Sequence, residues 1–582
     1  MVRFSVFSVS TPYNYSIKRL LEVAGYDVRK TSDYQAGLAA LVEATWLAGS
    51  LYPEDIVAQF IDKAHVAGKF SAFSNTQFGA VKEILRGGIF NDAGVESYAK
   101  PCAPLALGLM ELAAQASAGD KATRFFLASA DISNLGGLNK KFPDTRTKVD
   151  CLLQHLAQKP NALLEAWAEK NNYTIDSILL RTGGDEFKSV CRVRRNDGAP
   201  IDALEFAESL KTVGSEINRE IDHFSNVEHG MGSIPHLKQG RAQGVTNTVA
   251  LRALDPAKPD IAASLHEMEA DIAEMRKKTA KRHAVSAPTE SGAPHFPDDP
   301  PPSHHALAPT NPYADSTLNL YSDESLDQHS LRAALEKAGF QKLAAEHPLF
   351  PYNPHRRFCM LDENNATYQA LSDTEKNVVA RVQKAEELRG VIDPVTRTFS
   401  PAFRGAFEEV AKKQEFNPYI SFNFHNLAGM NRLGESMGDA VLRDIGGILE
   451  SAYITTFANQ QSAVAKRPPV LHVSGGEFRA LTPPGAPTPQ VRQFIRTVEK
   501  SINLLNKTPL EDYAQPRRII LPKPHPRTLG NIQNPKNSTE GLNFEFLGGI
   551  LDEHRQNNPG EIPHILGENI FAAAPSKSFG RA

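Results

Sequence analysis

The sequence is poor in cysteine and in long apolar runs, and it carries no excess of positive charge. Its four cysteines, among 582 residues, are scattered and form no Cys-x-x-Cys pair, so no disulfide framework is expected. No stretch approaches the roughly 18 consecutive apolar residues that a membrane-spanning helix needs. The first ten residues are too interrupted to form the apolar core of a signal peptide. These absences predict a cytoplasmic protein without a membrane span.

The charge balance excludes a generally basic, nucleic-acid-coating surface, because the formal net charge is −3. We therefore expect no nucleic acid among the partners. Apolar residues make up 41% and charged residues 23% of the chain, which is ordinary for soluble globular proteins. At about 150 residues a domain, the length predicts three or four domains.

Composition and periodicity divide the chain into five regions. They predict a helical N-terminal region (1–80), a mixed α/β domain (81–285), a linker rich in Pro, Ser and His (286–318), a helical connector (319–380) and a second α/β domain (381–582). The N-terminal region is either a regulatory or interaction domain or packing support for the first α/β domain.

Within the first α/β domain, strand and helix patterns alternate around a hairpin signal. Gly183-Gly184 stands between two β-prone runs, as in tight hairpins, because glycine adopts positive φ without steric cost. Such interleaving predicts an α/β (α+β) fold with a mixed sheet. The other expected elements are strands at 124–131 and 244–254 and helices at 148–171, 201–222 and 259–283.

Carboxylates cluster where these strands are expected to end. Asp185 and Glu186 directly follow the Gly-Gly pair, and Asp131 ends the strand at 124–131. If the strands are neighbours, Asp131 and Asp185 meet at one end of the sheet, near the carbonyl of Ile132. Carboxylate and carbonyl oxygens suit Mg²⁺ (or Mn²⁺) bound together with substrate phosphates. A solvated turn is the plainer alternative.

Cationic and polar residues nearby could bind the rest of a nucleotide. Lys278 and Arg282, at i and i+4 of a predicted helix, share one face and could hold a triphosphate. A merely solvated helix face is the alternative. Asn139 and Asp150 could hydrogen-bond a base, or serve only as caps and turns.

The second half of the chain repeats the landmarks of the first. Asp131-Ile-Ser-Asn-Leu-Gly-Gly-Leu-Asn-Lys140 matches Asn423-Phe-His-Asn-Leu-Ala-Gly-Met-Asn-Arg432, and Arg181-Thr-Gly-Gly-Asp-Glu-Phe187 matches His472-Val-Ser-Gly-Gly-Glu-Phe478. The strand beginning at Gln243 likewise corresponds to the one at Glu540. Matches in the same order predict two copies of one domain. We call 81–285 the first copy and 381–582 the second copy.

The first copy resembles the GGDEF domains, the diguanylate cyclases, in Arg181-Thr-Gly-Gly-Asp-Glu-Phe187 and its surroundings. The resemblance implies a nucleotide-cyclase-like (palm/ferredoxin-like) fold and assigns residues by position. It implies catalytic roles for Arg181, Asp185 and Glu186, and metal ligation by Asp131, Ile132 and Asp185. It implies guanine contacts from Asn139 and Asp150 and phosphate contacts from Lys278 and Arg282.

Two departures from the family pattern stand out in the first copy. The family usually continues Asp-x-Asp-x-Phe-Lys, where this chain has Ser133, Leu135 and Gly136, so the lysine that contacts phosphate is absent. The inhibitory Arg-x-x-Asp site is missing too, because Ser177 stands at the aspartate position and Asp176 one place off. Product feedback through that site is not expected.

The second copy lacks both metal-binding acids, because Asn423 and Gly476 stand in their places. By resemblance, Asn431, Asp439, Lys577 and Arg581 still match guanine and phosphate contacts. Asp393-Pro-Val-Thr-Arg-Thr-Phe-Ser400 resembles the Asp-x-Leu-Thr segment that enters such domains. This copy is therefore expected to bind nucleotide without catalysing a reaction.

Together these features predict a diguanylate cyclase that condenses two GTP molecules to cyclic di-GMP. The first copy would be catalytic, through a homodimer or through pairing of the two copies, and the second copy regulatory. The alternative is a non-catalytic signalling protein that binds GTP or a cyclic dinucleotide.

Overall fold

The computed structural model combines helices with two main antiparallel-rich sheets, in agreement with the predicted α+β class. The structure describes residues 7–87, 91–92, 97–98, 102–142, 146–182, 185–236, 243–255, 257–285, 296–297, 326–346, 352–353, 358–359, 361, 363–388, 393, 395–400, 419–457, 468–483, 486–517, 519, 521–535 and 539–548.

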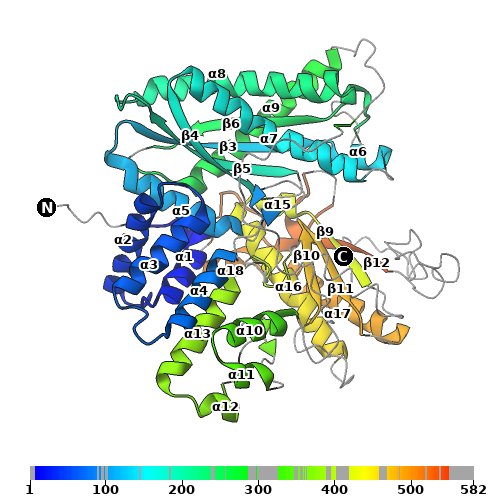
Figure 1. The fold of residues 1–582 in the computed structure, drawn as a ribbon. Coiled ribbons are helices and arrows are strands. Elements are labelled where there is room, and N and C mark those ends of the chain that lie inside the picture. The colour runs from blue at the N-terminus through cyan, green and yellow to red at the C-terminus, as the bar shows by residue number, and fades with distance from the viewer. Residues whose placement is uncertain are drawn as a thin grey trace. The chain divides into compact units, whose positions relative to one another are not determined.

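The chain forms two compact units (Figure 1). Unit 1 comprises Met1–Ser71 and Leu85–Thr310, and unit 2 comprises Ala72–Ile84 and Asn311–Ala582. The N-terminal region thus contributes to both units. No helix in the described part of the chain combines the length and the apolar character needed to cross a bilayer.

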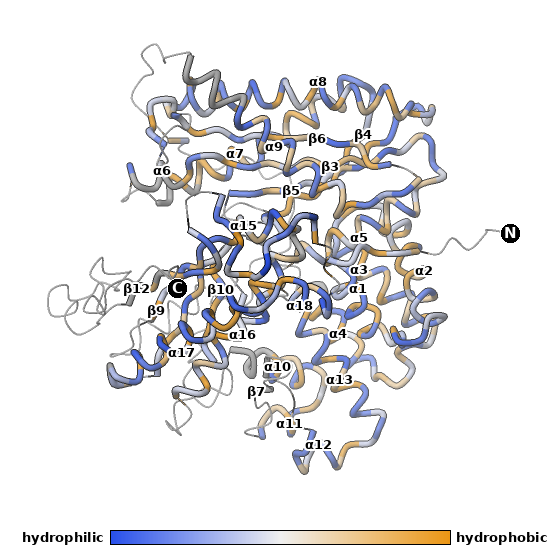
Figure 2. The backbone as a smooth tube through the Cα atoms, turned by 180° about the vertical axis from the view of Figure 1, so that it is seen from behind, coloured by the Kyte–Doolittle hydropathy of each residue, from blue (hydrophilic) through white to orange (hydrophobic). Residues whose placement is uncertain are grey.

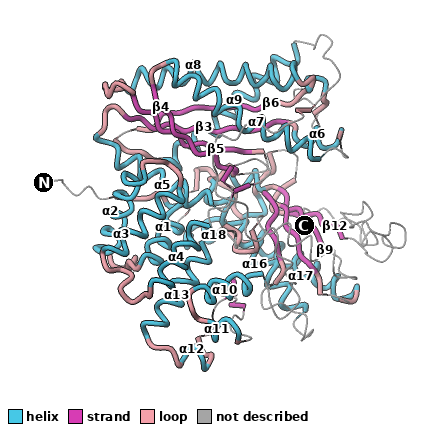
Figure 3. The backbone as a smooth tube through the Cα atoms, viewed as in Figure 1, coloured by secondary structure: helices cyan, strands magenta, loops and turns pink. Residues whose placement is uncertain are grey.

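Unit 1 is built on a six-stranded sheet in the order β1-β2-β4-β5-β3-β6 (Figure 3). All neighbouring pairs are antiparallel except β2 and β4. The four longer strands, β4, β5, β3 and β6, are those that the sequence predicts, whereas the short β1 and β2 were not expected. The strands are β1 (Asn91–Asp92), β2 (Ser97–Tyr98), β3 (Thr123–Ser133), β4 (Tyr173–Arg181), β5 (Glu186–Arg195) and β6 (Thr246–Ala253).

Alternation along β3 divides the helices of unit 1 between two faces of the sheet. Phe126, Ala130 and Ile132 join the apolar core with α7 (Arg146–Lys170) and α8 (Ala203–Asp222). The residues between them point to the opposite face. There α9 (Ile261–Val285) packs on β3 and β6. Figure 2 shows the alternation of apolar and polar residues along α8, which is typical of a helix with one buried face.

Helices from the N-terminal region pack on the first copy within unit 1. They are α1 (Thr11–Ala24), α2 (Thr31–Ala48) and α3 (Pro53–Val66), and they contact α5 (Ala103–Ala116). Gly108 allows this close approach, because a Cβ there would lie 2.8 Å from Ile17. Tyr98 of β2 is buried and donates a hydrogen bond of 2.8 Å to Glu54 of α3. The N-terminal helices are therefore joined to the sheet beside β4.

Unit 2 contains a four-stranded sheet in the order β10-β11-β9-β12. Its order is that of β4-β5-β3-β6 in unit 1, as the predicted internal repeat requires. The strands are β9 (Tyr419–His425), β10 (Val470–Ser474), β11 (Glu477–Leu481) and β12 (Asn543–Gly548). Its core is packed by α16 (Glu435–Phe457) and α17 (Thr488–Lys507), through residues such as Phe422, Phe478 and Phe494.

The predicted connector contains short helices and a two-stranded ribbon. The ribbon pairs β7 (Tyr352–Asn353) with β8 (Phe358–Cys359), which the sequence did not predict. The other α-helices among the described residues are α4 (Asn75–Gly87), α6 (Leu135–Lys141), α10 (Leu326–Lys337), α11 (Gln341–Ala345), α12 (Ala366–Gln369), α13 (Asp373–Leu388), α15 (Leu427–Asn431) and α18 (Leu510–Ala514).

Candidate functional site

The register of β3 and β5 brings the predicted carboxylates of the first copy together. Asp131 lies directly opposite Glu186 in the antiparallel ladder. One step further, the Ile132 amide donates to the carbonyl oxygen of Asp185 at 2.8 Å. Asp131, Asp185 and Glu186 therefore meet at the end of β3, as the sequence predicts.

Asp131 is the most enclosed of these acids. Its side chain is only 17% exposed, whereas Asp185 is half-buried and Glu186 exposed. Burial raises the pKa of Asp131 to about 7, the Arg276 cation opposes that rise, and the charges of Asp185 and Glu186 add to it. A buried carboxyl group beside two other acids favours an added cation.

Arg276 of α9 ion-pairs with Asp131, a contact that sequence reasoning missed. Its Nε also donates to the Ser133 hydroxyl at 3.1 Å. The helix faces the sheet through a stripe at helical spacing, which Arg276 extends by one turn beyond Ile272. The sequence did contain a signal for this contact: an arginine on an otherwise apolar helix stripe needs a buried acidic partner. The buried members of the stripe are Ile261, Leu265, Met268 and Ile272.

Other ion pairs hold α9 over the same face of the sheet. Lys188 of β5 lies 3.2 Å from Glu269, and Arg252 of β6 lies 2.7 Å from Asp271. The predicted phosphate-binding residues Lys278 and Arg282 lie further along this continuous helix. Their side chains fall outside the described part of the structure, so their contacts stay predictions.

Arg181 ends β4 opposite Phe187, and its guanidinium carbon lies 5.8 Å from the centre of that ring. The Thr182 amide then donates to the Glu186 carbonyl at 3.0 Å, closing the hairpin. Gly183 and Gly184 themselves lie outside the described residues. The strand pairing nevertheless confirms that β4 and β5 form the predicted hairpin.

The two base-contact candidates of the first copy lie on different helices. Asn139 is in α6 and Asp150 is in α7, but neither side chain is among those described. The segment before them is anchored by Asn134, which has a φ of 67° and donates to the Gly244 carbonyl at 2.9 Å. A Cβ on Gly137 would collide with the Asn134 side chain, so this repeated Asn-Leu-x-Gly landmark has a structural reason.

Asp176, the residue one place from the missing inhibitory position, has a structural partner. Its carboxylate lies 2.7 Å from Arg192 and 3.2 Å from Arg194 on the neighbouring strand. Arg192 also donates to the Gly49 carbonyl at the end of α2, at 2.8 Å. Asp176 therefore helps to join the N-terminal helices to the sheet.

The second copy repeats the backbone geometry without the acids. Asn423 lies opposite Glu477, and the Phe424 amide donates to the Gly476 carbonyl at 2.9 Å. These contacts place Asn423 and Gly476 where the first copy has Asp131 and Asp185. A Cβ on Gly476 would collide with the Phe424 carbonyl oxygen. The local backbone thus leaves no room for a side chain at this position.

A buried histidine–aspartate pair supports the turn of the second copy instead. His472 Nδ1 lies 3.0 Å from Asp393 Oδ2, and His472 Nε2 lies 2.9 Å from the Gly475 carbonyl oxygen. Each ring nitrogen of His472 therefore faces an oxygen atom. The side chains are 0% and 1% exposed. This pair, which the sequence did not predict, ties the entry segment to the turn.

Asn431, one of the two predicted base contacts of the second copy, lies beside the first turn of α16, the helix that carries Asp439. A Cβ on Gly438 would overlap the Asn431 amide, so Asn431 lies against the residue that precedes Asp439. Asn431 is exposed and Asp439 is half-buried. Lys577 and Arg581, the predicted phosphate contacts, lie outside the described residues.

The oxygen atoms of Asp131 and Asp185 are suitable ligands for a divalent cation, but they do not complete its coordination shell. Asp131 and Asp185 offer two carboxylates, and Mg²⁺ is commonly held by one or two such groups with water and phosphate oxygens. Over the residues that the structure describes, no three His, Cys, Asp or Glu side chains are grouped to hold a metal ion.

Comparison with known proteins adds no family name. No protein-family model matches the chain, and no curated protein matches it.

Proposed function

We propose that the protein is a diguanylate cyclase whose first copy condenses two GTP molecules to cyclic di-GMP. The observation that carries the proposal is the meeting of Asp131, Asp185 and Glu186 at the end of β3, beside the helix that bears Lys278 and Arg282. The acids offer oxygen donors at one end of the sheet, and Lys278 and Arg282 would add the cations that nucleotide triphosphate binding requires.

Each candidate site residue of the first copy has a role in the proposal. Asp131, Asp185 and the Ile132 carbonyl would hold Mg²⁺ (or Mn²⁺). When bound, the ion would neutralise phosphate charge and favour deprotonation of the attacking 3′-hydroxyl. The remaining assignments rest on the family resemblance: Arg181 and Glu186 at the reacting groups, Asn139 and Asp150 at guanine, and Lys278 and Arg282 at the phosphates.

The second copy is proposed to regulate rather than to catalyse. It has Asn423 and Gly476 in place of the two metal-binding aspartates, and the Phe424 carbonyl leaves no room for a side chain at Gly476. By the family resemblance, Asn431 and Asp439 would bind guanine there, and Lys577 and Arg581 would contact phosphate. Two sites facing one another, in a homodimer or within one chain, would align one GTP with the other.

The test is incubation of the full chain with GTP and Mg²⁺, with detection of cyclic di-GMP. We expect Asp185→Asn to reduce product formation by about 100-fold or more, since it removes charge at the reacting phosphates. A matched control is Glu208→Gln, which removes an exposed carboxylate on α8 that pairs with Lys211. No product from the unaltered chain, or equal product from Asp185→Asn, would exclude the cyclase proposal.

A second candidate is a non-catalytic protein that binds GTP or a cyclic dinucleotide. It is favoured by Arg276, whose guanidinium is already paired with Asp131, and by Gly136, which lacks the phosphate-contacting lysine of the family. Calorimetric GTP binding without product would support this candidate. Unchanged GTP affinity in Asn431→Ala would remove the role proposed for the second copy.

A further inference from the structure

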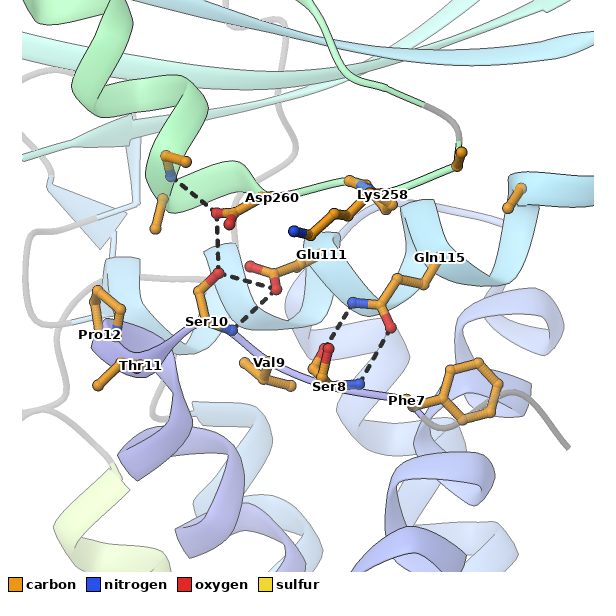
Figure 4. A pocket seen from close by; sticks show the side chains of 15 residues that line it. Phe7, Ser8, Val9, Ser10, Thr11, Pro12, Glu111, Gln115, Lys258 and Asp260 are labelled. Carbon is orange, nitrogen blue, oxygen red and sulfur yellow. Dashed lines mark hydrogen bonds between the residues drawn. The ribbon is translucent and has the colours of Figure 1, made fainter.

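A cavity of about 680 Å³ lies within unit 1, away from the residues of the proposed cyclase site (Figure 4). It is bounded by the N-terminal segment 7–12, by α5, and by the turn from β6 into α9. Ligand cavities for small molecules commonly measure about 300–1,000 Å³. The cavity is therefore large enough for a metabolite.

Three charged side chains from two segments of the chain line this cavity. Glu111 comes from α5, and Lys258 and Asp260 come from the turn before α9. Figure 4 shows Lys258, Glu111 and Asp260 directed toward the same space, with Ser10 beneath them. Glu111 is only 3% exposed, so its carboxyl group forms the floor of the cavity.

Glu111 has fewer hydrogen-bond donors than its carboxylate can accept, whereas Asp260 Oδ1 also accepts the Ala263 amide at 2.9 Å. The Ser10 hydroxyl lies 3.0 Å from Glu111 Oε1 and 3.2 Å from Asp260 Oδ1, but it has one proton to share. The Ser10 amide donates to Glu111 Oε1 at 2.9 Å. Among the described residues, Glu111 Oε2 has no partner at full hydrogen-bond geometry, although the Ile261 amide also acts on this carboxyl group. A buried oxygen of this kind costs free energy until a donor reaches it.

Charge points to the donor that is missing. Burial raises the pKa of Glu111 to about 7, hydrogen bonds from Ser10 and the Ile261 amide oppose that rise, and the charge of Asp260 adds to it. An ammonium group would supply both hydrogens and positive charge to the two acids. Lys258, at the exposed side of the cavity, forms no ion pair with a described residue and would attract an anion.

We propose that this cavity binds a small zwitterionic ligand of the α-amino-acid class. Its ammonium group contacts Glu111 and Asp260, and its carboxylate contacts Lys258. The site is independent of the proposed cyclase chemistry, because none of its residues has a role there.

The test is calorimetric titration of the full chain with each standard L-α-amino acid in turn. We expect at least one to bind. For that amino acid, we expect the N-acetyl derivative, which lacks the ammonium group, and the carboxamide derivative, which lacks the carboxylate, to bind about tenfold more weakly or worse. Absence of binding by every amino acid at millimolar concentration would overturn the proposal, as would equal binding of the N-acetyl derivative.

Variants then locate the binding. Lys258→Met and Glu111→Gln should each weaken the amino acid that binds by about tenfold, whereas Lys211→Met and Glu208→Gln, an exposed pair on α8, should not. If Glu111→Gln fails to fold, Lys258→Met decides alone, since Lys258 is exposed. Unchanged affinity in Lys258→Met would overturn the proposal.

Discussion

The ends of β3 and β9 have the same backbone and different chemistry. In the first copy, the Ile132 amide donates to the Asp185 carbonyl in the turn. In the second copy, the Phe424 amide donates to the Gly476 carbonyl in the same way. The first turn carries an acid there and faces a buried aspartate. The second has no side chain and is supported from behind by the buried His472–Asp393 pair. A shared fold therefore does not carry a shared site, because the difference lies in a few side chains and in how closely the backbone approaches them.

His472 and Arg181 occupy equivalent positions at the start of the two matched turn motifs. We expect the largest difference in stability between the copies when these two residues are substituted. His472→Leu leaves the buried Asp393 carboxyl group and the Gly475 carbonyl without the ring that contacts both, and should destabilise unit 2 by about 3–5 kcal/mol. Arg181→Leu removes a half-buried cation over Phe187, worth about 0.5–1 kcal/mol. Hydrogen exchange of the β10–β11 and β4–β5 amides measures the two separately. A smaller effect from His472→Leu than from Arg181→Leu would contradict the buried-pair interpretation.

The buried acid Glu111 should make the stability of unit 1 depend on pH. Glu111 faces Ser10, Asp260 and the Lys258 side of the cavity. The folded-state pKa of Glu111, about 7, lies above its ordinary value near 4.5. Folded protein therefore holds a proton that unfolded protein releases, and stability falls as pH rises through that interval.

Glu111→Gln should remove this loss of stability, which amounts to at most about 3 kcal/mol. Denaturant unfolding at pH 5 and pH 8 provides the measurement, with Glu208→Gln as the exposed control. Relative to the unaltered chain, Glu111→Gln should gain stability only at the higher pH. A pH-independent difference would contradict the assignment of this titration to Glu111.

A smaller effect is expected from adding one methyl group to the second turn. Gly476→Ala places a Cβ against the Phe424 carbonyl and should destabilise unit 2 by about 1–3 kcal/mol. Asp185→Ala at the equivalent place in the first copy shortens a half-buried side chain, and we expect its effect on stability to stay within about 0.5 kcal/mol. Hydrogen exchange of β9 and β3 reports on each. Equal effects would show that the two turns are packed alike.

The smallest difference is expected where the two copies agree most. Gly137 lies against Asn134, and Gly429 lies against Asn426, which donates to the Gly541 carbonyl at 2.9 Å as Asn134 does to Gly244. Gly137→Ala and Gly429→Ala should each cost about 1–3 kcal/mol, differing by less than about 0.5 kcal/mol. Protease resistance of each unit in urea measures both. A clearly smaller destabilisation by Gly429→Ala would show that the second copy is packed less tightly around Gly429 and Asn426.

Sequence patterns predicted the parts of the molecule that depend on local periodicity. The runs at 124–131 and 244–254 are β3 and β6, and the charged helix at 259–283 is α9. The meeting of Asp131 with Asp185 and Glu186 followed from strand pairing, so it could be predicted as well. Family membership and activity stay predictions.

The features that were missed depend on contacts between segments far apart in the sequence. Two-residue strands such as β1 and β2 carry too few residues for a periodic signal. The Arg276–Asp131 pair joins residues 145 positions apart, and the His472–Asp393 pair joins residues 79 apart. The closed space at Gly476 is a property of the backbone rather than of residue type, so only coordinates reveal it.

The close approach of the Phe424 carbonyl to Gly476 has a consequence for how this chain can evolve. The Phe424 carbonyl oxygen lies where a side chain at position 476 would have to begin. Restoring aspartate by one codon change would now strain the turn before any charge was regained, and Asn423 would also have to revert. A single substitution therefore cannot place an acid at position 476 without strain in the turn, whereas position 185 already carries one.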